Sequence, residues 1–304
     1  MSPNLNKSII ILGASGFVGK NLSYFLSKYF KVINSYREGV YSLDEYVFFD
    51  LNVYSTWDNI LKIKADYIVN CIGYGVVKDE DNLKMMYDVN FLTMSKFYDY
   101  LSENNFTGNV IHIGTAFEYD LSTIRIDEQT TTLPKSHYGI SKLMMSEYLI
   151  KKNHLKNYLI IRPFNMFGLF ESDSKIIPSL INSQKFNKKI YLSSGLQKRD
   201  YFHVNDLAKF LVILIEKCYF NNLPKIINVG SGRTFSIREI ANQLTELLPT
   251  FDDRLWSWNS LSQREGETME FFNNSQIANK LGFTTSSLKE GFKQTIKYYW
   301  NNES

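Results

Sequence analysis

The stretch KSIIILGASGFVGKNLSYFLSKY, residues 7–29, decides the fold of this chain. It opens with a short run of β-branched residues, which is typical of a buried strand. After a glycine turn it continues with apolar residues at positions 17, 18, 22, 25 and 26, a spacing that follows one face of an α-helix. The segment therefore predicts a strand, a tight loop and a helix, in that order.

The loop between this strand and helix has the pattern G-x-x-G-x-x-G. Glycines let the backbone turn tightly and approach a ligand closely. Because the N–H groups and the dipole at the start of a helix attract negative charge, the arrangement suits a pyrophosphate. We therefore predict a dinucleotide site whose contacts come from Gly13, Ser15, Gly16, Phe17, Val18 and Gly19.

Four further apolar runs indicate buried strands, with helical patterns between them. They lie within residues 31–37, 65–74, 108–117 and 157–168. Continuous apolar strands that alternate with helices are typical of a parallel sheet covered on both faces. The sequence thus predicts an α/β fold with a Rossmann-type, doubly wound parallel sheet.

Beyond about residue 164 the regular alternation weakens, although residues 236–248 and 275–283 have helical patterns. We expect residues 1–163 to form the dinucleotide-binding domain. Residues 164–304 are expected to form mainly a smaller C-terminal, substrate-binding lobe, with 200–232 returning to the first domain.

The composition excludes several classes of protein. Hydrophobic residues make up 44% of the chain and charged residues 21%, which argues against disorder. The net charge of +3 and the scattered lysines give no nucleic-acid-binding stripe. No run of about 18 apolar residues predicts a membrane span. The two cysteines, Cys71 and Cys218, lie in apolar runs and suggest no disulfide framework, so we expect a cytoplasmic protein.

The end of the second expected strand bears on the choice of dinucleotide. An acidic residue there binds the adenosine ribose and selects NAD, but no acid precedes Glu38. Arg37 can pair with a 2′-phosphate and Tyr36 can flank the adenine, so the residues favour NADP(H), with NAD(H) also possible. Asp50 and Leu51, which follow the next apolar run, are expected beside the adenine.

Tyr138 and Lys142 stand four residues apart at the start of an apparent helix. Residues at this spacing lie on one helical face, so a phenol and an ammonium can share a small volume. A neighbouring cation favours the phenolate and lowers the pKa of the tyrosine toward the working range. The pair can therefore act in proton transfer.

Seven ordered motifs together resemble the extended short-chain dehydrogenase/reductase family, in its nucleotide-sugar branch. They span nearly the whole chain and are GASGFVG (13–19), DVNFLT (88–93), GTAFEY (114–119), YGISK (138–142), RPFNMFG (162–168), RDYFHVNDLA (199–208) and NVGSG (228–232). The resemblance implies that Tyr138 is the acid/base, that Lys142 lowers its pKa and holds the nicotinamide ribose, and that Thr115 bonds the reacting oxygen.

The resemblance also implies the remaining binding residues, and it implies no metal. Further cofactor contacts are expected from Cys71, Gly73, Asn90, Pro163 and Phe164, in addition to Tyr138 and Lys142. Contacts to a nucleotide sugar are expected from Lys78, Thr115, Ala116, Phe117, Asn165, Arg199 and Arg264. The two arginines are expected at the diphosphate, although the usual proline before the glycine that follows Arg264 is missing.

Residues near Thr115 restrict the reaction. Family members that dehydrate the 4,6-position carry an Asp-Glu pair directly after the catalytic Thr, where this chain has Ala116 and Phe117. Epimerase-reductases of the branch carry a Cys and a His where this chain has Phe117 and Phe170. What remains is hydride transfer at one carbon.

We therefore expect an NADPH-dependent reductase of a nucleotide-activated 4-keto-6-deoxyhexose, in the synthesis of deoxysugars for bacterial surface glycans such as lipopolysaccharide. An NAD-dependent nucleotide-hexose 4-epimerase is the alternative. A non-catalytic NADP-binding sensor or scaffold is a further rival, but Tyr138 and Lys142 are both present. The resemblance also implies a homodimer.

Overall fold

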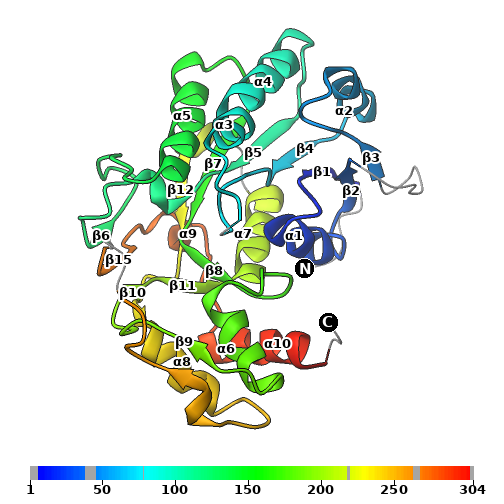
Figure 1. Cartoon of the computed structure of the whole chain (residues 1–304). Helices are drawn as coiled ribbons and strands as arrows, with labels where there is room; N and C mark the ends of the chain where they lie inside the picture. Colours follow the sequence, from blue (N-terminus) through cyan, green and yellow to red (C-terminus); the bar gives the residue numbers. More distant parts are fainter. Residues whose placement is uncertain (1–5, 38–45, 78, 218–219, 263–267, 302–304) are drawn as a thin grey trace.

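A seven-stranded parallel sheet forms the centre of the molecule (Figure 1). The computed structural model describes residues 6–37, 46–77, 79–217, 220–262 and 268–301. The strand order is β12-β7-β5-β4-β1-β2-β3. These strands span Ser8–Leu12 (β1), Lys31–Tyr36 (β2), Tyr46–Phe48 (β3), Tyr67–Asn70 (β4), Asn109–Ile113 (β5), Tyr158–Pro163 (β7) and Ile226–Val229 (β12). The predicted Rossmann-type sheet is confirmed.

Alternate residues of each strand enter two separate cores, one on each face of the sheet. Ile9 and Ile11 of β1 point to one core and Ile10 and Leu12 to the other. Both faces are therefore apolar, which is why these strands read as continuous hydrophobic runs.

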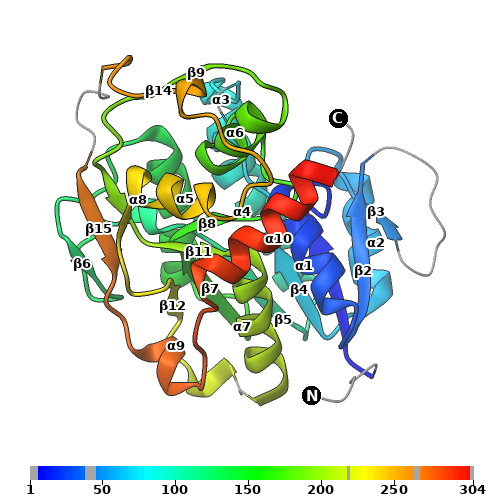
Figure 2. The same cartoon turned by 90° about the horizontal axis from the view of Figure 1, so that it is seen from below.

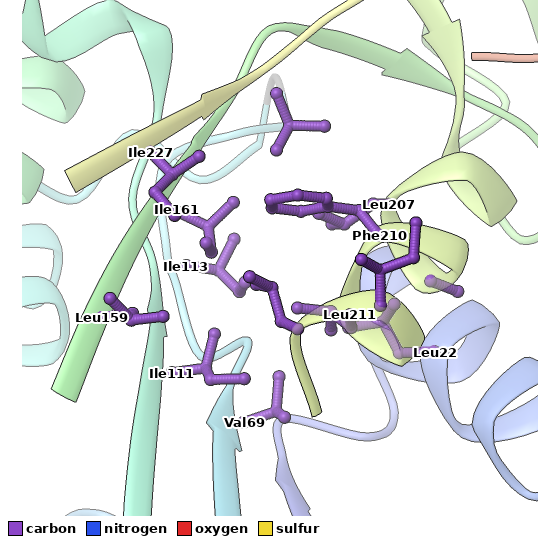
Figure 3. Close-up of a cluster of buried hydrophobic side chains, with 14 of the residues drawn as sticks. Leu22, Val69, Ile111, Ile113, Leu159, Ile161, Leu207, Phe210, Leu211 and Ile227 are labelled. Carbon is purple, nitrogen blue, oxygen red and sulfur yellow. The ribbon is translucent and has the colours of Figure 1, made fainter. Parts of the chain in front are cut away.

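Helices cover the two faces. On the first face lie α1 (Phe17–Leu26) and α7 (Val204–Lys217). Leu207, Phe210 and Leu211 of α7 pack against isoleucines of β5, β7 and β12 (Figure 3). On the second lie α2 (Trp57–Ile63), α4 (Thr93–Glu103) and α5 (His137–Lys152), with the short α3 (Leu83–Tyr87) beside α5. Within the described ranges, none of the helices has both the length and the apolar character that crossing a membrane needs.

The smaller lobe lies beyond the carboxyl ends of the strands of the large sheet (Figures 1 and 2). Its core is formed by α6, α8 and α10 together with Phe167 and Trp256. These helices span Ile176–Lys185 (α6), Ile237–Thr245 (α8) and Leu288–Asn301 (α10); the shorter α9 spans Ile277–Lys280. Ser236 and Glu239 form a capping box that fixes the start of α8.

Short strands join this lobe to the large sheet. One small sheet has the order β13-β10-β15-β6, and two pairs are β11-β8 and β14-β9. They span Arg125–Ile126 (β6), Asn165–Phe167 (β8), Ile190–Tyr191 (β9), Lys198–Arg199 (β10), Tyr201–His203 (β11), Phe235–Ser236 (β13), Trp256–Ser257 (β14) and Glu270–Asn273 (β15). Since α7 and β12 follow β11 and pack into the large sheet, the chain crosses between the two parts more than once. A domain boundary at residue 163 stays a prediction.

Candidate active site

A cavity of about 950 Å³ lies where β1, β2 and β4 end and α1 begins. Strand β1 lies between β2 and β4, so the strand order reverses there and a crevice opens, which is where such sheets bind ligands. Nine residues predicted to bind the cofactor line it, namely Gly13, Ser15, Gly16, Tyr36, Arg37, Asp50, Leu51, Cys71 and Gly73. The other eight do not line it: Phe17, Val18, Gly19, Asn90, Tyr138, Lys142, Pro163 and Phe164.

The glycine loop has the geometry that a pyrophosphate needs. Gly13 has a φ of +75°, and a Cβ on Gly19 would lie 2.2 Å from the carbonyl oxygen of Gly13. Helix α1 starts after Gly16 with no side-chain cap and no acid in its fully described first turn. Its free N–H groups therefore face the cavity side of the loop, and the residues fit a dinucleotide.

The wall of the cavity at β2 contains a residue that the sequence reasoning missed. The Oδ1 atom of Asn34 is buried and has no hydrogen-bond partner among the described residues. The next residue, Ser35, is engaged, because its Oγ accepts the N–H of Gly13 at 3.1 Å. An amide side chain within the buried part of β2 was the available signal for Asn34. Its free carbonyl oxygen suits a ribose hydroxyl or an adenine amino group.

The start of α5 positions the tyrosine and the lysine. Ser136 caps this helix by accepting the N–H of Gly139 at 3.1 Å. Tyr138 is half-buried and Lys142 is 3% exposed. The Nζ of Lys142 donates to the carbonyl oxygen of Ile113 at 2.6 Å. This bond fixes the ammonium at the end of β5, directly before the strand turns toward Thr115.

Burial has opposite effects on the two side chains. Burial, followed by the negative charge of Glu118, raises the pKa of the Tyr138 phenol; a hydrogen bond with Thr115 opposes the rise and the charge of Glu80 adds to it. Burial lowers the pKa of Lys142 to about 8, against the opposing charges of Glu118 and Cys71. The role of Lys142 in lowering the tyrosine pKa stays a prediction.

Thr115 is held by a buried ion pair that the sequence reasoning did not identify. Its backbone N–H donates to Oε1 of Glu118 at 2.9 Å, and Oε2 of Glu118 accepts the Nε–H of Arg162 at 2.8 Å. The Nη2 atom of Arg162 lies 2.7 Å from the same oxygen, as an ion pair. Glu118 is 0% exposed and Arg162 1%. The ring of Tyr119 lies 4.5 Å from the guanidinium. The sequence contained a signal for this ion pair, since Glu118 lies inside the motif GTAFEY and Arg162 inside the motif RPFNMFG.

Asn90 lies in a π-helical turn, Asp88–Leu92, that interrupts the helix before α4. Its side chain bonds both backbone groups of Tyr74 at 2.8 Å and the Oγ of Ser141 at 2.9 Å. Such bulges often occur at functional sites. Here the amide joins the loop after β4 to helix α5, so Asn90 positions the site through Tyr74 and Ser141.

Two of the predicted sugar-binding residues, Phe117 and Arg199, lie beside the ring of Phe271. Phe117 packs edge-on against Tyr138 and against Phe271, with ring centroids 6.5 and 6.0 Å apart. The Oδ1 of Asn165 is buried without a hydrogen-bond partner among the described residues. The guanidinium of Arg199 lies 4.9 Å from the ring of Phe271.

Two predicted sugar contacts, Lys78 and Arg264, lie outside the described residues, while Ala116 is buried beside Thr115 in the turn Ala116–Glu118. Cavity residues that the sequence reasoning did not assign to a binding site include Lys20, Tyr74 and Glu80. Among the residues that the structure describes, no group of three or more His, Cys, Asp or Glu side chains could hold a metal ion.

Comparison with known proteins agrees with this arrangement. Residues 9–230 match the model of the NAD dependent epimerase/dehydratase family. The chain is 28% identical over 244 residues to GDP-6-deoxy-D-talose 4-dehydrogenase of Aggregatibacter actinomycetemcomitans, covering 79% of each chain. It is 25% identical over 230 residues to a putative UDP-glucose 4-epimerase of Methanocaldococcus jannaschii, covering 73% of this chain and 71% of the relative.

Solved structures share the fold. MoeE5 in complex with UDP-glucose and NAD superposes with a TM-score of 0.83 at 20% identity, covering 96% of this chain and 98% of the other. A UDP-N-acetylglucosamine 4-epimerase from Methanobrevibacter ruminantium superposes with a TM-score of 0.83 at 21% identity, covering 98% and 99%. With the glycine loop, the Tyr138–Lys142 pair and a family match over most of its length, the chain belongs to the NAD dependent epimerase/dehydratase family, whose members use a nicotinamide cofactor.

Proposed function

We propose that this protein reduces the 4-keto group of a nucleotide-activated 4-keto-6-deoxyhexose with NADPH, in the cytoplasmic synthesis of bacterial deoxysugars such as those of lipopolysaccharide. The observation that carries the proposal is the set of side chains at the start of α5. The Tyr138 phenol is hydrogen-bonded with Thr115, and Lys142, one turn further on the same helix, is fixed by the carbonyl of Ile113. A phenol held in this way can act as a proton donor. Reduction of a carbonyl needs such a donor.

The chain offers few other groups for proton transfer at this point. Ala116 and Phe117 carry no titratable group, and Glu118 is fully engaged by Arg162 and the N–H of Thr115. The turn that follows Thr115 therefore offers no second acid or base beside Tyr138. Neither dehydration nor epimerisation at carbons 3 and 5 fits this set.

The roles of the side chains follow from their positions. The bound nicotinamide would supply a hydride to the carbonyl carbon. Tyr138 gives its proton to the carbonyl oxygen as the oxygen gains negative charge, while the hydroxyl of Thr115 donates a hydrogen bond to the same oxygen. Lys142, held by the carbonyl of Ile113, places a positive charge behind the phenol and favours its proton release once the cofactor site is filled.

The preference for NADPH is supported by the end of β2. Arg37 is exposed at the edge of the cavity, next to Tyr36, and residues 31–37 contain no carboxylate that would repel a 2′-phosphate. A guanidinium there can pair with that phosphate through two N–H groups. The deoxyhexose is supported by the relative named GDP-6-deoxy-D-talose 4-dehydrogenase and by a CDP-abequose synthase of Salmonella muenchen, 24% identical over 177 residues.

A 4-epimerase is the second candidate. The similarity to the putative UDP-glucose 4-epimerase favours it, and Thr115, Tyr138 and Lys142 would also serve an oxidation followed by a reduction at carbon 4. In that case the cofactor would be retained between turnovers.

The two functions are separated by following NADPH at 340 nm after addition of a freshly generated nucleotide 4-keto-6-deoxyhexose, with NADH in parallel. We expect consumption of NADPH. The reductase proposal fails if neither cofactor is consumed while a nucleotide hexose is converted to its 4-epimer. A Tyr138→Phe variant is the control for enzyme-dependent turnover.

We also propose a homodimer formed through α3, the π turn and α5. Apolar side chains on these elements are exposed, namely Leu83, Met85, Leu92 and Met144. Exposed apolar side chains on helices that pack side by side suit a helix-to-helix contact between two copies.

A further inference from the structure

The segment between β8 and α6 places Phe170 in the wall of the dinucleotide cavity. Phe170 lines the cavity and is 36% exposed, although it belongs to the part of the chain that enters the smaller lobe. Its φ of +63° is uncommon for a residue with a side chain and persists where surrounding contacts hold the backbone. One such contact comes from the Asn21 amide of α1, which donates to the carbonyls of Phe17 at 2.8 Å and Leu169 at 2.7 Å. The segment is thereby tied to the first turn of α1.

The C-terminal helix α10 holds the same segment from another side. The ring of Tyr298 packs edge-on against the Phe170 ring, with the centroids 5.0 Å apart. The hydroxyl of the neighbouring Tyr299 donates to the carbonyl of Glu171. The residues on both sides of Phe170 are therefore bonded to other elements, and the ring is held beside the start of α1.

Lys20 of α1 lies against this ring. Its Nζ is 5.5 Å from the centre of the Phe170 ring, within the range of a cation–π interaction. Gly16, Lys20 and Tyr24 line the cavity from one face of the helix. Because helical side chains lean toward the N-terminus, the Lys20 side chain covers the turn at Gly16, where the free N–H groups suit a pyrophosphate. Among the described residues no carboxylate pairs with Lys20, so its charge is available to an anion.

We propose that Lys20 binds the pyrophosphate of the dinucleotide and that Phe170 positions Lys20, so that the smaller lobe takes part in cofactor binding. An ammonium beside the amides at a helix start adds a charge-assisted hydrogen bond to the anion that these amides bind. The aromatic ring restricts the lysine to the cavity side of α1. The inference rests on the dinucleotide site of the proposed function and applies to the reductase and to the 4-epimerase alike.

The test compares NADPH with NADH, which share the pyrophosphate and differ in the 2′-phosphate. Dissociation constants are measured by calorimetry on cofactor-free protein for the wild type, Lys20→Met, Phe170→Leu and the double variant. In Lys20→Met we expect the constants of both cofactors to rise by the same factor, about 10-fold. In Phe170→Leu we expect a rise of about 3-fold. The same change in the Lys20→Met background should have no further effect, because the ring acts through the lysine.

Two matched controls lie outside the cavity. Phe186→Leu changes an exposed ring of the smaller lobe, which Lys185 covers at 4.8 Å from the ring centre. Lys217→Met removes a positive charge from the exposed end of α7. Both variants should keep the wild-type dissociation constants.

The outcomes separate this inference from the choice of cofactor. An unchanged constant in Lys20→Met, or a loss confined to NADPH, would overturn the role of Lys20 at the pyrophosphate. An equal effect of Phe170→Leu with and without Lys20 would overturn its positioning role. If Arg37→Met left the NADPH constant unchanged while Lys20→Met weakened both cofactors, the NADPH preference would be rejected and the inference kept.

Discussion

A buried carboxyl group in the smaller lobe makes the stability of the protein depend on pH. Glu171 follows β8 in a segment that is fixed at both sides: the Asn21 amide donates to the carbonyl of Leu169 at 2.7 Å, and the Tyr299 hydroxyl donates to the carbonyl of Glu171. Its own Oε2 is buried and has no hydrogen-bond partner among the described residues. Burial raises the pKa of this carboxyl from 4.5 to about 8, although Lys175 and the N–H of Gly168 oppose the rise.

The direction of the pH effect follows from proton linkage. Below pH 4.5 the Glu171 carboxyl is protonated in both the folded and the unfolded chain. Between 4.5 and about 8 the unfolded chain loses this proton while the folded chain keeps it, so the free energy of unfolding falls as pH rises. Above a pH of about 8 the Glu171 carboxyl is ionised in both the folded and the unfolded chain, and the loss in free energy of unfolding reaches its full value. The difference between the two pKa values corresponds to a loss of at most about 5 kcal/mol in the free energy of unfolding. Because the folded chain relaxes and water enters around the ionised carboxylate, we expect the loss to be about 2 kcal/mol.

Glu171→Gln removes the charge and keeps the shape. We expect it to match the wild type near pH 4.5 and to exceed it in free energy of unfolding by about 2 kcal/mol at pH 8.5. Urea unfolding at five pH values between 4.5 and 9 measures the difference, with the exposed Glu246→Gln as control. Parallel curves for the wild type and Glu171→Gln would refute the reasoning.

Three further predictions concern the site and the assembly. Glu118→Gln leaves the buried Arg162 charge unpaired and should lower the free energy of unfolding by about 3 kcal/mol in chemical denaturation; a loss within error of zero would show that the pair is not needed. Tyr138→Phe should lower kcat for the keto sugar about 100-fold or more while the dissociation constant for NADPH stays unchanged, and equal turnover would exclude its role as proton donor. Light scattering at micromolar concentration should give a dimer for the wild type and a monomer for Leu92→Glu. Tyr191→Glu, which changes an exposed residue of the smaller lobe in the same way, is the control and should stay a dimer. A monomeric wild type would reject the dimer.

The large sheet could be read from the sequence because its signals are local. The run Ser8–Leu12, the glycine loop and α1 each follow from residues within a few positions of one another. The predicted strands at 31–37, 65–74, 108–117 and 157–168 all contain strands of the sheet for the same reason. Apart from β8, which lies within the predicted segment 157–168, the short strands that link the smaller lobe were not predicted. Strands of two to four residues are formed by pairing with distant segments and leave no periodic pattern.

The residues of the candidate site also fall into those that local sequence signals identified and those that they did not. Tyr138, Lys142 and Thr115 were identified from spacing and motif resemblance. The surroundings of Tyr138 could not be identified, because Glu80 comes from one loop and Thr115 and Glu118 come from another, and both are distant from Tyr138 in the sequence. Their combined effect on the phenol depends on burial, which a spacing of four residues does not contain.

The sequence by itself determined the alternation of strands and helices in the first half of the chain, the dinucleotide loop and the family, since each is encoded in contiguous motifs whose backbone geometry is local. Only the tertiary structure decided which charges surround the reacting phenol, which carboxylates are engaged by Arg162 or by backbone amides, and which polar atoms are buried without a partner. Those properties depend on distances between segments far apart in the chain and on the exclusion of water around them, and both arise only when the sheet and the smaller lobe pack together.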